Sequence, residues 1–283
     1  MIIHGIRSVI RAIEKNSSLF EEKNFDQRAD AIDFLEFQMI GLRPGDLKDR
    51  AEKLKTRLEE TDRQLFEKLR ESIRAGKYKG SDFRNMVSEY AGINTNDEPG
   101  YNNPDIFING IFHFQPMPEQ TKALEPEMVF YQKTPARVIF ELAEKVHFTE
   151  HDVFFDIGSG LGQAVILVNL LTGVKTIGTE FEPAFCEYAR ACAAELNLTD
   201  VTFVNTDARN ADYSGGTIFF MYTPFTGDML NKVLVLLKKE ALHREIKIIT
   251  YGPCTLQVAE QSWLRRIGPK DTGIYKPVIF YSF

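Results

Sequence analysis

The spacing of apolar residues changes character along the chain. In the first part, apolar residues recur three and four positions apart, which is typical of helices with one buried face. This pattern predicts helices over residues 2–13 and 25–40, and a long helix that follows Asp46 and ends near Gly76. We therefore predict an N-terminal helical domain over residues 1–93. Its helices could pack within the chain, recruit a substrate, or form a homodimer.

From Tyr131 onward, short apolar runs alternate with helical patterns. Thr134-Pro135 is typical of a helix start, with Thr at the N-cap and Pro at the first helical position. Strands are predicted at 153–157, 174–179, 201–204, 217–222 and 246–251, and they are separated by helices. This alternation predicts a Rossmann-like α/β domain over residues 129–283 with a mostly parallel sheet. Two final strands, 263–267 and 277–283, have no helix between them and predict an antiparallel hairpin at the sheet edge.

Residues 94–128 fit neither pattern. Asn, Pro and Gly are frequent there, and aromatic residues stand between them: Tyr101, Phe107, Phe112 and Phe114. A long segment of this kind in a compact protein is often functional. We predict a linker or a lid over the substrate site.

Composition excludes several classes of protein. Apolar residues make up 43% of the 283 residues, charged residues 26%, and the net charge is −6, which is typical of a globular protein and does not favour nucleic acid as a partner. No apolar run approaches the ~20 residues needed to span a bilayer, and no signal peptide is evident, so we expect a cytoplasmic protein without a membrane partner. Three cysteines without a CxxC pair favour neither a disulfide framework nor a metal site.

The strongest chemical signal is the segment Asp156-Ile157-Gly158-Ser159-Gly160-Leu161-Gly162-Gln163, between a predicted strand and a predicted helix. Glycines there allow a tight turn and a close approach of a ligand to the backbone. An acid two residues before the first glycine suits a ligand with an ammonium group and disfavours a pyrophosphate. The segment therefore favours S-adenosylmethionine (SAM) over a dinucleotide.

Further acids follow the next two strands. Glu180 ends the second strand, where a carboxylate can accept hydrogen bonds from ribose hydroxyls, and Phe181 could pack on adenine. Asp207-Ala208 follows the third strand, where an acid can accept the adenine amino group. Acids at three successive strand ends predict one cofactor site.

Residues 129–283 resemble the class I SAM-dependent methyltransferases, and the region around the glycine motif is most similar to the non-SET histone-lysine methyltransferases. The resemblance implies a seven-stranded sheet, SAM as methyl donor, and a loop carrying Tyr131 and Thr134 beside the cofactor. Asp156, Gly158, Ser159, Gly160, Gly162 and Gln163 would then bind SAM with Thr134, Glu180, Phe181, Asp207 and Ala208.

The fourth strand departs from that family. Its expected Asn-Asn-Phe-type segment is replaced by Met221-Tyr222-Thr223-Pro224-Phe225-Thr226, which also lacks the polar residue of the nucleobase amino-methylating enzymes. Tyr222 and Phe225 could still line the acceptor pocket with Tyr131, because ligands bind at the ends of parallel strands. The acceptor therefore stays open between a protein lysine and a small metabolite. A nucleotide-dependent oxidoreductase and a non-catalytic binding protein are the remaining alternatives.

Overall fold

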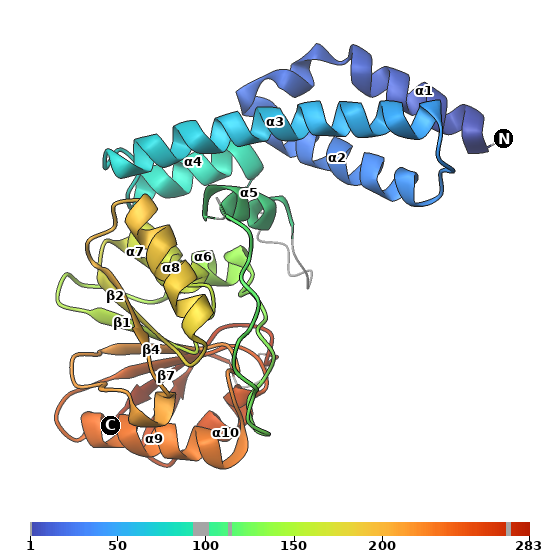
Figure 1. Ribbon diagram of the computed structural model, residues 1–283. Helices are drawn as coiled ribbons and strands as arrows, with labels where there is room; N and C mark the ends of the chain where they lie inside the picture. The colour runs from blue at the N-terminus through green and yellow to red at the C-terminus, as the bar shows by residue number, and fades with distance from the viewer. Residues whose placement is uncertain (1, 93–101, 113–114, 270–272) are drawn as a thin grey trace.

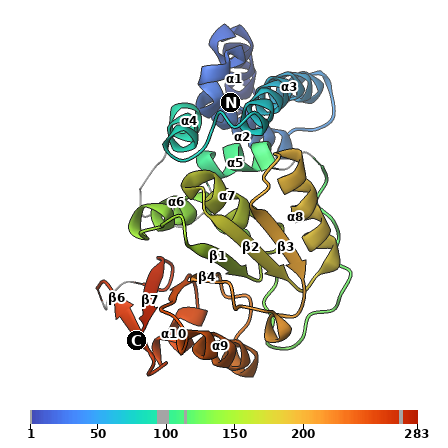
Figure 2. The ribbon, with the colours of Figure 1, turned by 90° about the vertical axis from the view of Figure 1, so that its left-hand side faces the viewer.

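The computed structural model describes residues 2–92, 102–112, 115–269 and 273–283. Figures 1 and 2 show an elongated helical part above a layered α/β part. The helices are α1 (Ile2–Lys15), α2 (Phe25–Ile40), α3 (Asp46–Arg74), α4 (Ser81–Ala91), α5 (Asn103–Phe112), α6 (Ala136–Lys145), α7 (Gln163–Thr172), α8 (Pro183–Glu195), α9 (Gly227–Ala241) and α10 (Cys254–Ala259), with short 3-10 helices at Ser17–Phe20, Glu22–Asn24 and Ala208–Asn210. The strands are β1 (Val153–Ile157), β2 (Lys175–Glu180), β3 (Val201–Asn205), β4 (Ile218–Met221), β5 (Lys247–Thr250), β6 (Leu264–Ile267) and β7 (Val278–Ser282).

The sheet confirms the predicted fold. Its seven strands have the order β3-β2-β1-β4-β5-β7-β6, and the first five are parallel. β7 pairs antiparallel with both β5 and β6, so the predicted hairpin stands at the edge. The chain crosses from β1 to β2 to β3 and then returns to β4 beside β1. This reversal opens a crevice at the carboxyl ends of the central strands, where ligands bind in open α/β sheets.

Side chains of the central strands alternate between two buried faces. Phe154 and Phe220 point into a core shared with α6, α7 and α8, whereas Phe155 and Phe219 point into a core shared with α9 and α10. Period-two alternation of large apolar residues on both faces is what a sheet covered by helices on each side requires. The central strands are therefore rigid supports for the loops that follow them.

The helical part contains two different cores. The second half of α3 packs with α4 and α5 against the sheet domain, through residues such as Leu69, Phe83 and Phe107 in one continuous core. By contrast, α1, the far end of α2 and the first half of α3 enclose a separate core around Leu35 and Leu54. We call this outer portion, residues 2–58, the arm; it projects away from the sheet domain (Figure 1).

A buried ion pair stands where the two cores meet. Arg28 of α2 is fully buried and donates from Nε to Asp62 Oδ1 of α3 at 2.6 Å. Its NH1 donates to the carbonyl oxygens of Leu19 and Glu21 at 2.7 and 2.9 Å. Burial raises the pKa of Asp62 to about 6 despite the attraction of Arg28. The pair thus fixes how α2 crosses α3 between the cores.

Three local predictions need correction. Residues 103–112 form α5 rather than a loop, and Phe107 and Phe112 are buried; Tyr101 and Phe114 lie outside the described residues. Helices α4 and α10 were not predicted; α10 has only six residues. Helix α6 begins at Ala136, with Pro135 instead of Thr134 at the N-cap position. The Ala136 amide donates to Asp105 of α5, so a side chain remote in sequence caps this helix.

Within the described part of the chain, no helix combines the length and apolar character needed to cross a membrane.

Candidate functional site

A cavity opens at the carboxyl ends of β1, β2, β3 and β4. Its empty space, about 980 Å³, is continuous with solvent. Most of the site residues predicted from the sequence line this cavity: Tyr131, Thr134, Asp156, Gly158, Ser159, Gln163, Glu180, Phe181, Asp207, Ala208, Tyr222 and Phe225. Residues from four strand ends and from the segment before α6 thus meet in one place.

The glycine turn connects β1 to α7. Gly158, Gly160 and Gly162 all have positive φ, at 80°, 53° and 82°, a conformation that other residues rarely adopt. A Cβ atom on Gly158 would stand 2.4 Å from Pro224 Cβ, and one on Gly160 would stand 2.2 Å from the Tyr131 ring. The turn is therefore packed closely against Tyr131 and Pro224, which belong to the two segments predicted to line the acceptor pocket.

Gly160 and Gly162 differ from the predicted pattern, because neither lines the cavity. The Gly160 amide donates to Glu180 at 2.7 Å beneath the Tyr131 ring. Gly162 faces the Phe203 ring, which a Cβ atom would approach to 2.5 Å. These two glycines shape the turn and allow helix–strand packing, whereas Gly158 borders the ligand space.

Two carboxylates stand behind the turn. Burial and the nearby charge of Glu180 raise the pKa of Asp156 to about 8. Burial also raises the pKa of Glu180, although it accepts hydrogen bonds from the amides of Gly160 and Glu182 at 2.7 and 2.8 Å. A buried acid beside a partly buried one, each with a raised pKa, creates a site that favours a cationic ligand.

Two buried side-chain atoms beside the turn have no hydrogen-bond partner among the described residues. They are Ser159 Oγ and Gln163 Oε1, on side chains that are 6% and 4% exposed and that line the cavity. The Gln163 amide nitrogen donates to the Thr134 carbonyl at 3.2 Å, which fixes the direction of its oxygen. Buried polar atoms are rarely left unpaired, so this pair fits a polar ligand such as the amino-acid end of SAM.

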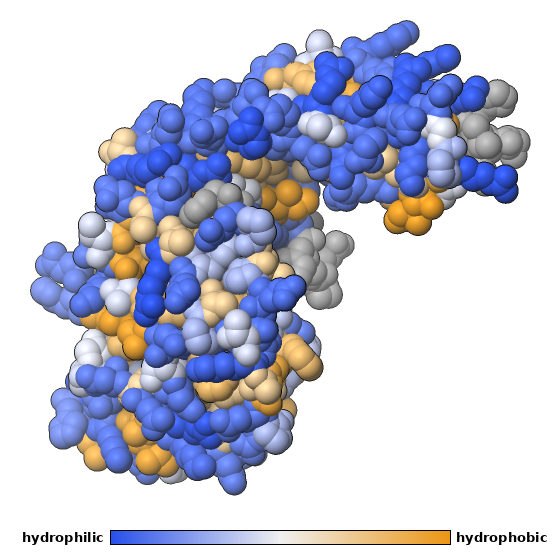
Figure 3. Space-filling model, in the orientation of Figure 1, coloured by the Kyte–Doolittle hydropathy of each residue, from blue (hydrophilic) through white to orange (hydrophobic). Residues whose placement is uncertain are grey.

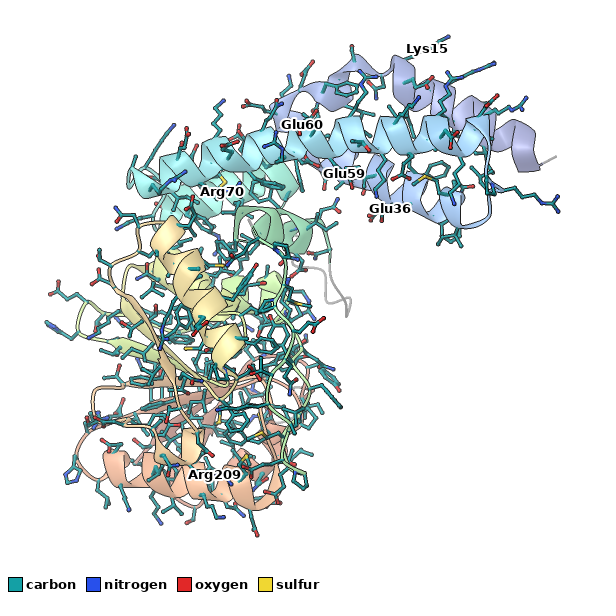
Figure 4. All side chains as sticks on the ribbon, in the orientation of Figure 1. Lys15, Glu36, Glu59, Glu60, Arg70 and Arg209 are labelled. Atoms are coloured by element: carbon teal, nitrogen blue, oxygen red, sulfur yellow. The ribbon has the colours of Figure 1, made fainter. Side chains whose placement is uncertain are left out.

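The third predicted acid is already engaged. Asp207 Oδ1 accepts from the Arg209 backbone amide at 2.8 Å and from Arg209 Nε at 2.9 Å. The Arg209 hydrogen bond holds the pKa of Asp207 below its usual value. Asp207 lines the cavity, but Arg209, which is labelled in Figure 4, pairs with it and neutralises its charge.

The segment of residues 120–132, which we call the strap, forms the outer wall of the cavity and runs alongside the sheet domain (Figure 1). Glu182, which is 3% exposed, accepts from the Thr121 and Lys122 amides at 2.9 and 2.7 Å and from Thr121 Oγ1 at 2.6 Å. Arg209 binds Glu125 at 2.7 Å, and this contact ties the strap to β3.

The far end of the strap is held by the loop after β4. Glu127 accepts from the amides of Asp228 and Met229 at the start of α9, at 3.0 and 2.6 Å. The Val129 amide donates to the Pro224 carbonyl at 3.1 Å. Together with Glu182, these contacts hold the strap across the ends of β2, β3 and β4.

The side of the cavity predicted to hold the acceptor is aromatic. Tyr131 packs against Phe185 with ring centroids 5.5 Å apart, and the Tyr222 hydroxyl donates to Gln132 Oε1 at 3.1 Å. Phe225 is 4% exposed and forms an isolated antiparallel bridge with Met128 of the strap. These contacts bring the loop after β4 against the strap.

The loop after β4 also carries backbone strain. Thr223 has a φ of 37°, which is unusual for a β-branched residue and costs of order 1–3 kcal/mol. Its hydroxyl donates to the Tyr251 carbonyl and accepts from the Cys254 amide, both at 3.1 Å. The strained residue orients the cavity-lining segment Tyr222–Phe225.

Sequence reasoning missed Glu182, Gln132 and Thr223. Glu182 precedes Pro183 and accepts from the Ala184 amide as the N-cap of α8, a local signal that was present in the sequence. The contacts of Gln132 and Thr223 depend on segments remote in the chain. Among the described residues, no group of three or more His, Cys, Asp or Glu could hold a metal ion.

Residues 125–217 match the family model described as histone methylation protein DOT1. No protein of curated function matches the chain. Among solved structures, an RNA methyltransferase from Salinibacter ruber in complex with S-adenosyl-L-homocysteine is 22% identical, over 53% of this chain and 92% of that one, with a TM-score of 0.42. A SAM-dependent methyltransferase from Aquifex aeolicus is 18% identical, over 53% and 93% of the two chains, also with a TM-score of 0.42.

The DOT1 match extends from the strap to the residue before β4, and so includes the glycine turn and the ends of β2 and β3. It thus covers most of the elements that form the cavity. Over this part of the chain, the protein is similar to a family of histone methylation proteins.

Proposed function

We propose that the chain transfers the methyl group of SAM to the side-chain amine of a lysine in a protein. The observation that carries the cofactor part of this proposal is the charge of the cavity. Four carboxylates line it, those of Asp156, Glu180, Glu182 and Asp207, although Arg209 pairs with Asp207 and Asp156 is mostly protonated at pH 7. Among the described residues, the lining includes no Lys, Arg or His. Such a cavity favours cationic ligands and disfavours phosphate-bearing ones.

In this proposal the inner end of the cavity holds the cofactor. Ser159 Oγ and Gln163 Oε1 would bind the amino-acid end beside Asp156, because their hydrogen-bonding capacity is unfilled. Glu180 can accept ribose hydroxyls in addition to its two amides, since a carboxylate has about four acceptor positions. Phe181 would pack on adenine, and Asp207 would face its amino group.

Bound SAM supplies a methyl group that its sulfonium charge has already activated. The residues around the acceptor therefore mainly align the amine and exclude water. Tyr131, Tyr222 and Phe225 would do so from the strap side. The lysine ammonium first loses a proton to water; its nitrogen lone pair then forms the N–C bond, and the electrons of the broken C–S bond stay on sulfur.

Two observations favour a protein amine over a metabolite. The DOT1 match covers the cavity-lining segments from the strap to the end of β3, though not the loop after β4. The outer wall of the cavity is also apolar, and Phe130 there is 77% exposed, which suits the alkyl chain of a lysine near a protein surface.

Transfer of tritiated methyl groups from SAM to a cell extract tests the proposal. We expect label in the protein fraction, recovered as methyl-lysine after acid hydrolysis, and none with Asp156→Ala. Label confined to small molecules would overturn the lysine proposal. Isothermal titration of SAM with Glu180→Ala tests the cofactor assignment separately, and unchanged affinity would contradict a ribose role for Glu180.

A further inference from the structure

Helix α2 carries an exposed stripe on the side that faces away from α3. The stripe consists of Asp26, Asp30, Asp33, Phe37 and Ile40, all exposed, and we call it the α2 stripe. Alternating steps of four and three residues place these side chains in one row, about 21 Å long at 1.5 Å per residue. The same spacing aligns the residues of one helix against a neighbouring helix in a coiled coil.

The outer end of the α2 stripe is apolar. Phe37 is 72% exposed and Ile40 is 84% exposed, and they stand one turn apart. Figure 3 shows apolar surface at this end of α2, on an arm whose surface is otherwise mostly hydrophilic. On the other side of α2, Leu35 and Met39 already fill the core of the arm. Phe37 and Ile40 are therefore not needed to hold the arm together.

The inner part of the α2 stripe is acidic. None of its three aspartates forms a salt bridge with any described residue. The Asn103 side chain, which is uncharged, donates to Asp26 and Asp30. Partial burial and the negative charges of Glu36 and Asp30 raise the pKa of Asp33. A positively charged partner would relieve this repulsion.

The α2 stripe lies toward the sheet domain. Asn103 begins α5, which packs between α3 and α6, so the stripe starts at the junction of the arm and the sheet domain. From there it follows the arm outward, and the neighbouring Glu36 is seen along the lower edge of the arm (Figure 4). The strap lies on the side of the sheet domain toward which the arm projects (Figure 1).

We propose that the α2 stripe docks a basic amphipathic helix of the methyl-acceptor protein. Lys or Arg side chains of that helix pair with the aspartates, and apolar side chains at the same spacing cover Phe37 and Ile40. The inference rests on the proposed function for the identity of the partner. Docking on the arm raises the local concentration of a target lysine carried on a flanking segment.

Two peptides test the docking. The long one joins a lysine-bearing segment to a helix with Lys and Leu at the complementary heptad positions, and the short one has only the lysine-bearing segment. The full chain is compared with two stripe variants, D26N/D30N/D33N and F37S/I40S. The control variant E52Q/E67Q/E71Q removes the same charge from exposed positions of α3.

We expect each stripe variant to raise the KM for the long peptide about tenfold, with unchanged kcat and an unchanged KM for the short peptide. Fluorescence anisotropy of the labelled long peptide gives its Kd without any turnover, so docking is decided even if no lysine is methylated. SAM titration checks that each variant retains its fold.

Equal Kd and KM for the wild-type chain, the stripe variants and the control overturn the proposal. Sedimentation equilibrium tests for the other occupant that would refute the proposal, a second copy of the chain. That occupant is identified if the wild-type chain is a dimer, the stripe variants are monomers, and all of them bind the peptide equally.

Discussion

Glu182 is the side chain on which the closed strap depends most. One oxygen accepts from the Thr121 hydroxyl and the Ala184 amide, and the other accepts from the Thr121 and Lys122 amides. In Glu182→Gln, an amide NH₂ replaces one of these oxygens and confronts two donors. Where it faces the Thr121 and Lys122 amides, both strap donors lose their acceptor, and in either orientation the loss of the negative charge weakens the remaining hydrogen bonds. The volume of the side chain stays the same.

The magnitude follows from those lost contacts. A hydrogen bond to a charged group contributes about 1.5–3 kcal/mol, so two of them amount to about 3 kcal/mol at the lower limit. That energy corresponds to about a hundredfold change in the equilibrium between a closed and an open strap. The strap must be closed around a bound ligand. Cofactor affinity therefore falls by the factor by which the substitution lowers the closed fraction of the free protein. We expect a loss of about tenfold to a hundredfold.

Isothermal titration of S-adenosyl-L-homocysteine measures the effect. Glu187→Gln is the matched control, because it makes the same substitution at an exposed position of α8. We expect the control to bind like the wild-type chain. Affinity of Glu182→Gln within about twofold of the control would refute the idea that the strap contacts support cofactor binding.

Three further predictions concern the turn, the ion pair and proton release on ligand binding. Gly158→Ala, whose Cβ would stand 2.4 Å from Pro224 at a φ of 80°, should lower kcat and the midpoint of thermal unfolding; wild-type kinetics would contradict the close packing of the turn. Asp62→Leu leaves Arg28 buried without its ion-pair partner, so the free energy of unfolding measured by urea denaturation should fall by about 3–5 kcal/mol. Adding Arg28→Met to this variant should restore most of that loss. Asp156, with a pKa of about 8, is mostly protonated at pH 7, and a cationic ligand favours its ionised form; binding should therefore release a proton and strengthen as pH rises from 6 to 8. Calorimetry in buffers of different ionisation enthalpy measures that proton, and a pH-independent affinity would contradict it.

The ion pair also has a pH signature of its own. Asp62 has a higher pKa in the folded chain, about 6, than its usual value of 3.8, so the folded state binds the proton more tightly. Its contribution to stability is therefore most favourable below the unfolded pKa and is lost as pH rises through 6. In Asp62→Asn, the midpoint of urea denaturation should vary less between pH 4 and 6 than in the wild-type chain; an identical pH profile would show that Asp62 does not titrate there.

Much of the cofactor site could be predicted from local sequence. The glycine turn depends on backbone conformations that few residues tolerate, and Asp156, Glu180 and Asp207 stand at strand ends that hydrophobic periodicity identifies. A parallel sheet brings those ends to one edge whatever the details of packing. The prediction of one cavity therefore needed only the order of strands and helices.

What the sequence determined by itself was the α/β fold, the turn and the identity of the acids, because each depends on short-range backbone preferences and on burial patterns with a fixed period. Tertiary structure decided the rest. Asp207 pairs with Arg209, Asp105 caps α6 from another helix, and Glu182 holds the strap, since each contact joins groups whose approach depends on how the layers pack. The separation of the arm from the main core is of the same kind: α3 has one continuous apolar stripe, and only its neighbours divide that stripe between two cores.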